Sequence, residues 1–123
     1  GKHYGSVHVR KCEIRKEGKL LLEASVADNF FLRLRGLIGR DPKSFGPLWI
    51  VPCSDIHTFM MSDAIDVLYL DKDYKVVKIA PNLVPGKVFA PVKHARSVVE
   101  LPVGSAAGLE IKENDQLEVI KNG

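Results

Sequence analysis

The chain has 123 residues, of which 46% are hydrophobic and 27% are charged. This length and composition are typical of one soluble globular domain and exclude disordered and fibrous proteins. No apolar run approaches the roughly 18 residues that a membrane-spanning helix needs, so we expect no membrane span. We expect a single domain over residues 1–123, with residues 1–6 forming a flexible N-terminus.

The start of the chain and its cysteines leave the compartment open. The first residue is Gly1 rather than Met, which is compatible with a removed signal peptide, tag or longer N-terminus. The two cysteines, Cys12 and Cys53, are too few to indicate an oxidising compartment, and we favour two separate thiols over a disulfide. The protein is either intracellular or exported after signal removal.

The net charge of +3 is unevenly distributed. Residues 1–43 contain ten basic and five acidic residues, whereas residues 44–123 contain eight basic and ten acidic ones. A basic flank attracts acidic partners, and nucleic-acid binding by this part is a third possibility after the two functions considered below. We expect no nucleic-acid partner, because the chain lacks the Arg-rich runs and interleaved aromatic residues of such proteins.

The first elements along the chain are a hairpin and a helix. Residues 7–15 and 20–26 read as strands joined across a short polar connection that contains Gly18. Residues 28–39 then place one apolar stripe at helical spacing, with Asp28 as the N-cap and Gly39 as the stop.

Short strands and turns account for the rest of the chain. Residues 65–70 give the clearest strand, with Ile65, Val67 and Tyr69 on one face and Asp66, Leu68 and Leu70 on the other. Pro and Gly residues make 81–94 the longest irregular loop. The other expected elements are strands at 47–52, 75–80, 97–101 and 116–120, a turn at 71–74, and one tight or helical turn at 104–108. The whole predicts a mainly β domain, a sandwich or barrel-like arrangement of about seven short strands with one capping helix, rather than a parallel βαβ fold.

Four sequence blocks carry a resemblance to a known family: Arg33-x-Arg35-Gly36-Leu37-x-Gly39-Arg40, then Cys53-x-x-Ile56-His57-Thr58-Phe59-x-Met61 leading into Ile65-Asp66-Val67-Leu68-Tyr69-Leu70-Asp71, then Val98-Val99-Glu100-Leu101-Pro102-x-Gly104, and Asp115-x-Leu117. The chain resembles a widespread prokaryotic family of uncharacterised conserved proteins, domain of unknown function 192, over nearly its whole length after residue 20. The resemblance implies a compact, mainly β, sandwich-like domain and no established activity.

Four positions depart from the family pattern. Leu32 stands where many members have Glu, and Ile38 where many have Met. The change at Leu32 removes a carboxylate and weakens any acid–base proposal at the helix. Tyr74 and Asn114 each stand where the family usually has Gly.

Cys53 and His57 form the first candidate site. Their spacing of four residues places them on the same side of a strand or of one helical turn. They suit a thiolate activated by His, with Asp66 as the orienting group, or two metal ligands joined by His94, Asp55, Met60 or Met61. We favour the structural alternative, in which Cys53 fills a core gap and His57 hydrogen-bonds a neighbouring segment. We predict no catalytic residue, no cofactor and no bound metal.

Asp66 and Glu100 alternate with apolar residues on their strands. A carboxylate on such a face is costly to bury unless it accepts hydrogen bonds or meets a cation. We favour a structural ion pair over a general base, because pairing lowers the pKa of a carboxyl group. The candidate cations for both carboxylates are Arg33, Arg35 and Arg40.

The leading functional hypothesis is a small, non-catalytic β domain that binds an unidentified small molecule or protein. The alternative is a thiol- or metal-dependent site centred on Cys53 and His57. Aromatic and polar side chains beside the loop 81–94 suit a modest apolar pocket with a few orienting contacts. The candidate binding residues are Cys53, His57, Thr58, Phe59, Met61 and Asp66.

Overall fold

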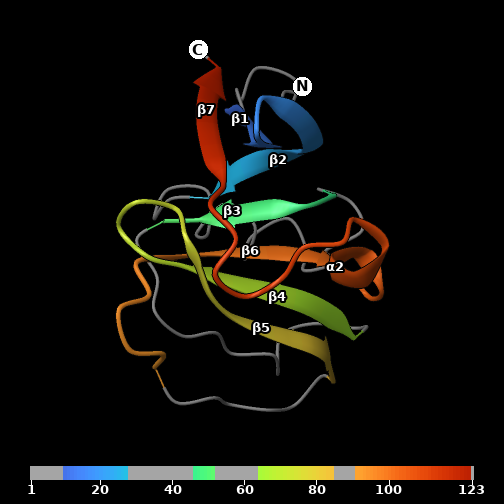
Figure 1. Cartoon of the computed structure of the whole chain (residues 1–123). Coiled ribbons are helices and arrows are strands. Elements are labelled where there is room, and N and C mark those ends of the chain that lie inside the picture. Colours follow the sequence, from blue (N-terminus) through green and yellow to red (C-terminus); the bar gives the residue numbers. More distant parts are fainter. Residues whose placement is uncertain (1–9, 28–45, 52–63, 85–90, 123) are drawn as a thin grey trace.

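The structure, a computed structural model, describes residues 10–27, 46–51, 64–84 and 91–122. Seven strands form one mixed sheet in the order β5-β4-β6-β3-β2-β1-β7 (Figure 1). The mainly β class expected from the sequence is therefore confirmed. The strands are β1 (Lys11–Lys16), β2 (Lys19–Ala27), β3 (Leu48–Ile50), β4 (Ile65–Leu70), β5 (Val76–Leu83), β6 (Ser97–Pro102) and β7 (Glu118–Asn122).

One helix lies in the described part of the chain, α2 (Ser105–Gly108), at the position where the sequence indicated a tight or helical turn. The longer helix expected at 28–39 lies outside the described residues. None of the helical residues that the structure describes belongs to a helix long and apolar enough to cross a membrane.

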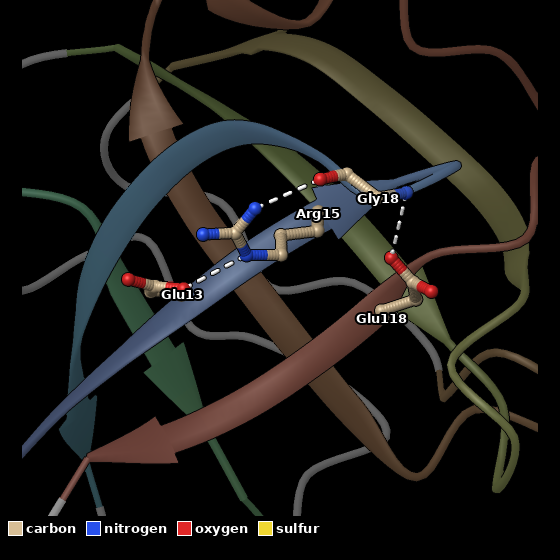
Figure 2. A network of polar contacts seen from close by, with 4 residues as sticks. All are labelled: Glu13, Arg15, Gly18 and Glu118. Atoms are coloured by element: carbon tan, nitrogen blue, oxygen red, sulfur yellow. Dashed lines mark hydrogen bonds and ion pairs between the residues drawn. The ribbon is translucent and has the colours of Figure 1, made fainter.

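The β1–β2 hairpin turns through two residues, Glu17 and Gly18, which have φ values of 53° and 77°. This pair of positive φ angles is typical of the type I′ turn that matches the twist of a hairpin. The Gly18 carbonyl accepts a 2.8 Å hydrogen bond from Arg15 Nη1, and its N–H donates to Glu118 Oε1 at 3.1 Å (Figure 2). Arg15 also pairs with Glu13 of the same strand, so side-chain contacts hold the turn to β1 and to β7.

The central strands are buried on both faces of the sheet. Every residue of β4 is buried, and alternate residues enter two different apolar clusters, as the sequence pattern predicts. We call the first cluster the barrel core; its buried members are Cys12, Ile14, Ala24, Val26, Trp49, Leu68, Leu70, Val76, Val99, Leu101, Ala106, Ile111 and Leu117. We call the second the outer-face cluster; its buried members are Ala27, Leu48, Ile50, Ile65, Val67, Tyr69, Ala80, Leu83, Ala95 and Val98.

A closing segment, residues 112–117, connects the two edges of the sheet. It leads into β7 at one edge and hydrogen-bonds to the start of β5 at the other (Figure 1). Val76 N–H donates to the Asp115 carbonyl at 2.9 Å, and Asn114 N–H donates to the Val76 carbonyl at 2.7 Å. Lys75 and Gln116 add an isolated antiparallel bridge. This segment therefore links the two edges of the open sheet through hydrogen bonds.

Two non-glycine residues in turns, Tyr74 and Asn114, have a left-handed backbone. Tyr74 has a φ of 69° and Asn114 a φ of 75°. Asn tolerates this region because its short polar side chain costs little there, whereas a bulky residue is strained. The Tyr74 ring packs edge to face against Trp49, with ring centroids 6.0 Å apart, which offsets part of that strain.

Two boundaries expected from the sequence are wrong. Residues 81–83 were expected in the irregular loop but belong to β5. Pro81 is tolerated because β5 is an edge strand and because the register shifts there, with Ile65 opposite Leu83 but Val67 opposite Ala80. The last strand covers Glu118–Asn122 rather than 116–120, since Gln116 instead forms an isolated bridge with Lys75, the residue before β5.

Asp115 ties the closing segment to the first hairpin. Its Oδ2 accepts hydrogen bonds from Lys112 N–H at 2.8 Å and from Lys16 Nζ at 2.9 Å. The backbone hydrogen bond, followed by the Lys16 contact, lowers the pKa of Asp115 below its ordinary value of 3.8. Folding therefore favours the ionised carboxylate, and its contribution is complete above the ordinary pKa and is lost as the pH falls through the lower folded value.

We expect the stability of Asp115→Asn to fall less steeply than that of the wild type as the pH is lowered. The measurement is the urea midpoint from about pH 6 to about pH 2.5, followed by circular dichroism. Asp73→Asn is the matched control, because Asp73 is exposed on a neighbouring turn. A profile below pH 4 that is equally steep in wild type and Asp115→Asn would contradict this role for Asp115.

Candidate functional site

The structure describes three of the candidate site residues: Asp66, Glu100 and the possible metal ligand His94, which is exposed and has a φ of 70°. The remaining candidates lie outside the described residues, so their expected contacts stay predictions. These are the binding candidates Cys53, His57, Thr58, Phe59 and Met61 and the ion-pair candidates Arg33, Arg35 and Arg40.

Asp66 lies on β4 with 1% of its surface exposed. Its Oδ1 accepts a hydrogen bond from Asn82 N–H, and its Oδ2 accepts one from Ala106 N–H, both at 3.0 Å. Asn82 lies at the register shift of β5 and has a φ of 54°, while Ala106 lies in α2. We call these three residues the Asp66 frame. It joins β4, β5 and α2 at one end of the sheet.

The frame explains how a carboxylate is tolerated in this position. A buried charge is costly unless hydrogen bonds replace its hydration, and here each oxygen receives one backbone N–H. The same two bonds satisfy N–H groups at a strand irregularity and in the first turn of a helix, where backbone donors lack partners within the element itself. Asp66 therefore has an architectural role in the described part of the chain.

The end of the sheet held by the frame is also where two candidate binding segments attach. Ile65, the first residue of β4, pairs with Leu83 of β5 and with Pro102 of β6. Residues 52–63 lead into β4 at this end, and residues 85–90 follow β5 from the same end. The start of β4 and the end of β5, to which these two segments connect in the sequence, are therefore neighbouring strand ends (Figure 1).

Two exposed aliphatic side chains lie at this end. Val84 directly follows β5 and is 44% exposed, and Val103 directly follows β6 and is 53% exposed. Ile65 pairs with Leu83 and Pro102, the residues that directly precede Val84 and Val103. The two valines therefore flank the start of β4. Exposed apolar side chains near strand ends offer contact surface to an apolar ligand.

Glu100 faces the opposite side of the sheet from Asp66. On β6, Val99 and Leu101 belong to the barrel core, so Glu100 between them points to the outer face. Its cross-strand partners there are Leu48 and Val67, and only 5% of its surface is exposed. The two carboxylates therefore lie on different faces and form no shared acid–base pair. Glu100 has a contact of its own within the molecule.

The thiol that the structure describes is part of the core. Cys12 is a free cysteine with no exposed surface, and burial raises the pKa of its thiol, an effect that a hydrogen bond with the Ala24 backbone and the charge of Lys121 partly oppose. A thiol with a raised pKa is a poor nucleophile near neutral pH. Among the described residues, no group of three His, Cys, Asp or Glu side chains is arranged to hold a metal ion.

Sequence reasoning missed the two other members of the frame, Asn82 and Ala106. Both contribute a backbone N–H, which every residue except Pro carries, so residue type gives no signal. The sequence offered only the indirect indication that Pro81 and Gly104 lie beside them at places where regular structure is interrupted.

These features define a small, mainly β, barrel-like domain in which a buried aspartate joins two strands and a helical turn. A family model described as "Uncharacterized ACR", DUF192, matches residues 12–119. The chain therefore belongs to this family of unknown function, as its sequence blocks predicted. Similar proteins include a UPF0127 protein of Pyrococcus abyssi, 34% identical over 87% of this chain and 91% of the relative. Another, from Pyrococcus furiosus, is 30% identical over 85% of this chain and 93% of the relative.

Two solved structures share the fold. One is a protein of unknown function from Novosphingobium aromaticivorans, with a TM-score of 0.68, 21% identity and coverage of 96% of this chain and 91% of the other. The second is a putative transcription regulator from Sinorhizobium meliloti, with a TM-score of 0.68, 19% identity and coverage of 97% and 98%. At these identities the likeness shows the fold alone. None of these relatives supports the thiol or metal alternative.

Proposed function

We propose that this protein is a non-catalytic binding domain that takes an apolar ligand at the end of the sheet held by the Asp66 frame. The binding surface comprises the exposed side chains of Val84 and Val103 together with the motif residues His57, Thr58 and Phe59. The segment that follows β5, residues 84–94, is the second part of the proposed surface.

The observation that carries the proposal is the pair of hydrogen bonds on Asp66. They hold two strand ends and α2 in a fixed arrangement where the candidate binding segments attach. Binding segments placed on a rigid scaffold lose less conformational entropy when they bind. Asp66 thereby contributes to binding through the frame rather than by contact with the ligand.

The chemistry of the surface favours an apolar ligand with a polar group. Val84 and Val103 supply aliphatic area, and Phe59 supplies an aromatic ring. His57 and Thr58 supply the small number of hydrogen-bonding groups that orient a ligand in such a site.

The test is an NMR titration of the ¹⁵N-labelled full chain with the apolar anion 1-anilinonaphthalene-8-sulfonate as the probe. We expect saturable shifts at the amides of Val84 and Val103, with affinity reduced about tenfold in Phe59→Ala and in Val103→Asp. Leu20→Asp is the control, because Leu20 is similarly exposed at 43% but lies on the first hairpin. Shifts that cluster elsewhere, or equal losses in all three variants, would contradict the proposal.

A second measurement separates binding from the thiol or metal alternative. Metal content and thiol reactivity are compared between wild type, Cys53→Ala and His57→Ala. Stoichiometric metal or a reactive thiol that disappears in both variants would replace the proposed function with a Cys53- and His57-centred site. An inert thiol with no bound metal agrees with the binding domain.

A further inference from the structure

The two edges of the sheet are protected to very different degrees. At the β5 edge, Val76 N–H donates to the Asp115 carbonyl and Ile79 N–H donates to Glu113 Oε2 at 3.3 Å. Further along the same strand, Pro81 has no N–H to offer. Proteins block edge strands by such means because unpaired backbone groups recruit other strands. The β5 edge is therefore closed to strand addition.

The β7 edge is open among the residues that the structure describes. Val26 N–H donates to the Arg10 carbonyl, so the Arg10 backbone faces β2. Backbone direction alternates along a strand, so Lys11, Glu13 and Arg15 face β7 instead. Their partners on β7 are Asn122, Ile120 and Glu118, which leaves the N–H and C=O groups of Val119 and Lys121 facing away from the sheet.

A hydrogen bond at the start of β7 confirms this alternation. Leu117, two residues before Val119, turns its N–H outward and donates it to the Tyr74 carbonyl at 3.1 Å. Beyond Leu117, the row of backbone groups that face away from the sheet continues through β7. The strand contains neither Pro nor Gly within Glu118–Asn122. Val119 and Lys121 thus present a short template for another strand.

We propose that β7 pairs with β7 of a second copy of this chain, antiparallel about a two-fold axis at Ile120. In this register Val119 faces Lys121 of the other copy, and both residues direct their backbone groups toward the partner. Each of the two symmetric pairs exchanges two main-chain hydrogen bonds, about four in all. Glu118 faces Asn122 of the other copy, so no like charges are opposed.

The side chains favour this register over its neighbours. Centring the axis on Lys121 would set two lysines directly opposite each other, which is destabilising. Centring it on Val119 would require the Leu117 N–H, which is already bonded to Tyr74. Centring it on Ile120 leaves the Lys121 ammonium where it is, 5.5 Å from the centre of the Trp49 ring.

The side chain of Ile120 is the reason to propose a second copy of this chain as the partner of β7. Its side chain is 45% exposed, while the other exposed side chains of β7 are polar and Val119 is partly buried. On the two-fold axis Ile120 faces itself in a non-hydrogen-bonded pair, where opposing side chains approach most closely. The contact therefore covers an exposed aliphatic side chain with an identical one.

The association is weak, because one five-residue strand per copy covers less area than stable interfaces need. We expect a Kd on the order of 100 μM. Sedimentation equilibrium of the full chain from about 10 μM to about 1 mM measures it. We expect Ile120→Asp to abolish the dimer and Leu20→Asp, a control of matched exposure, to retain it. A chain that remains monomeric at the highest concentration, or equal dimerisation of both variants, would overturn the proposal.

Cross-linking tests the register independently of affinity. In a Cys53→Ala background, Ile120→Cys, Lys121→Cys and Leu20→Cys are oxidised at the same concentration, with native spectra confirmed first. We expect a disulfide-linked dimer chiefly in Ile120→Cys, since only this position faces itself across the axis with Cα atoms close enough for a disulfide. Preferential cross-linking of Lys121→Cys or Leu20→Cys would reject the proposed pairing.

Discussion

Replacing Asp66 with Ala is expected to lower the free energy of unfolding by about 3 to 5 kcal/mol. The substitution leaves the N–H groups of Asn82 and Ala106 without their acceptors in a position where Asp66 is only 1% exposed. Each unsatisfied buried donor costs about 1 to 3 kcal/mol, and the lost bonds involve a charged acceptor. Because small domains are stable by only about 5 to 15 kcal/mol, this single change removes a large part of the total. Urea denaturation followed by circular dichroism measures it.

Asp66→Asn separates the contribution of the hydrogen bonds to stability from that of side-chain size. Its amide retains one acceptor oxygen but turns an NH₂ group toward the second N–H donor, so we expect about half the loss seen with Ala. Asp73→Asn, on an exposed turn, should change stability by less than about 0.5 kcal/mol. If Asp66→Ala costs less than about 1 kcal/mol, the frame does not hold this end of the sheet.

The Asp66 variants also connect stability to the proposed function. Under conditions where Asp66→Asn remains folded, we expect weaker binding of the anilinonaphthalene probe, because the frame no longer fixes the strand ends that carry Val84 and Val103. Unchanged probe affinity in a folded Asp66→Asn protein would leave the frame as a stabilising feature without a part in binding.

The second large effect is expected at Trp49, which lies in the barrel core with 1% of its surface exposed. Trp49→Ala should cost about 3 to 5 kcal/mol, since it removes the largest fully buried side chain and leaves a cavity. It also removes the edge-to-face contact with Tyr74 and the ring beneath the Lys121 ammonium.

Trp49→Phe should cost far less, about 1 to 2 kcal/mol. The indole N–H is buried with no hydrogen-bond partner among the described residues. Phe removes that donor, which returns part of the stability lost with the smaller ring volume. Val99→Ala, on the strand paired with Trp49, calibrates the cost of a cavity alone in this core. A Trp49→Phe protein as unstable as Trp49→Ala would show that the N–H has a partner in solution, such as a buried water.

Local patterns in the sequence correctly located most of the described strands. The alternation of residues 65–70 predicted both the limits of β4 and the face of each side chain. Gly18 marked the first hairpin turn, and the Pro-bounded segment 47–52 contained β3. These features follow from side-chain period and from backbone preferences of single residues, which act over a few positions.

The boundaries of the edge strands β5 and β7 depended on residues that are distant in the sequence. Pro81 ends a strand in most settings, yet here it lies in β5 because β5 is an edge strand of the described sheet and its register shifts at this point. Gln116 has the alternation of a strand residue, but its position is set by Lys75, 41 positions earlier. The position of each strand in the sheet and its pairing with distant residues decided both cases.

Strand alternation and the four sequence blocks were sufficient to predict the mainly β class, the family and an aspartate at the start of a buried strand. The contacts of that aspartate depend on the folded arrangement of the chain. The donors to Asp66 come from positions 16 and 40 residues away, and both are backbone N–H groups that carry no residue-specific signal. The fold likewise determines that Glu100 faces away from Asp66, because the face of each residue depends on strand register and not on residue type.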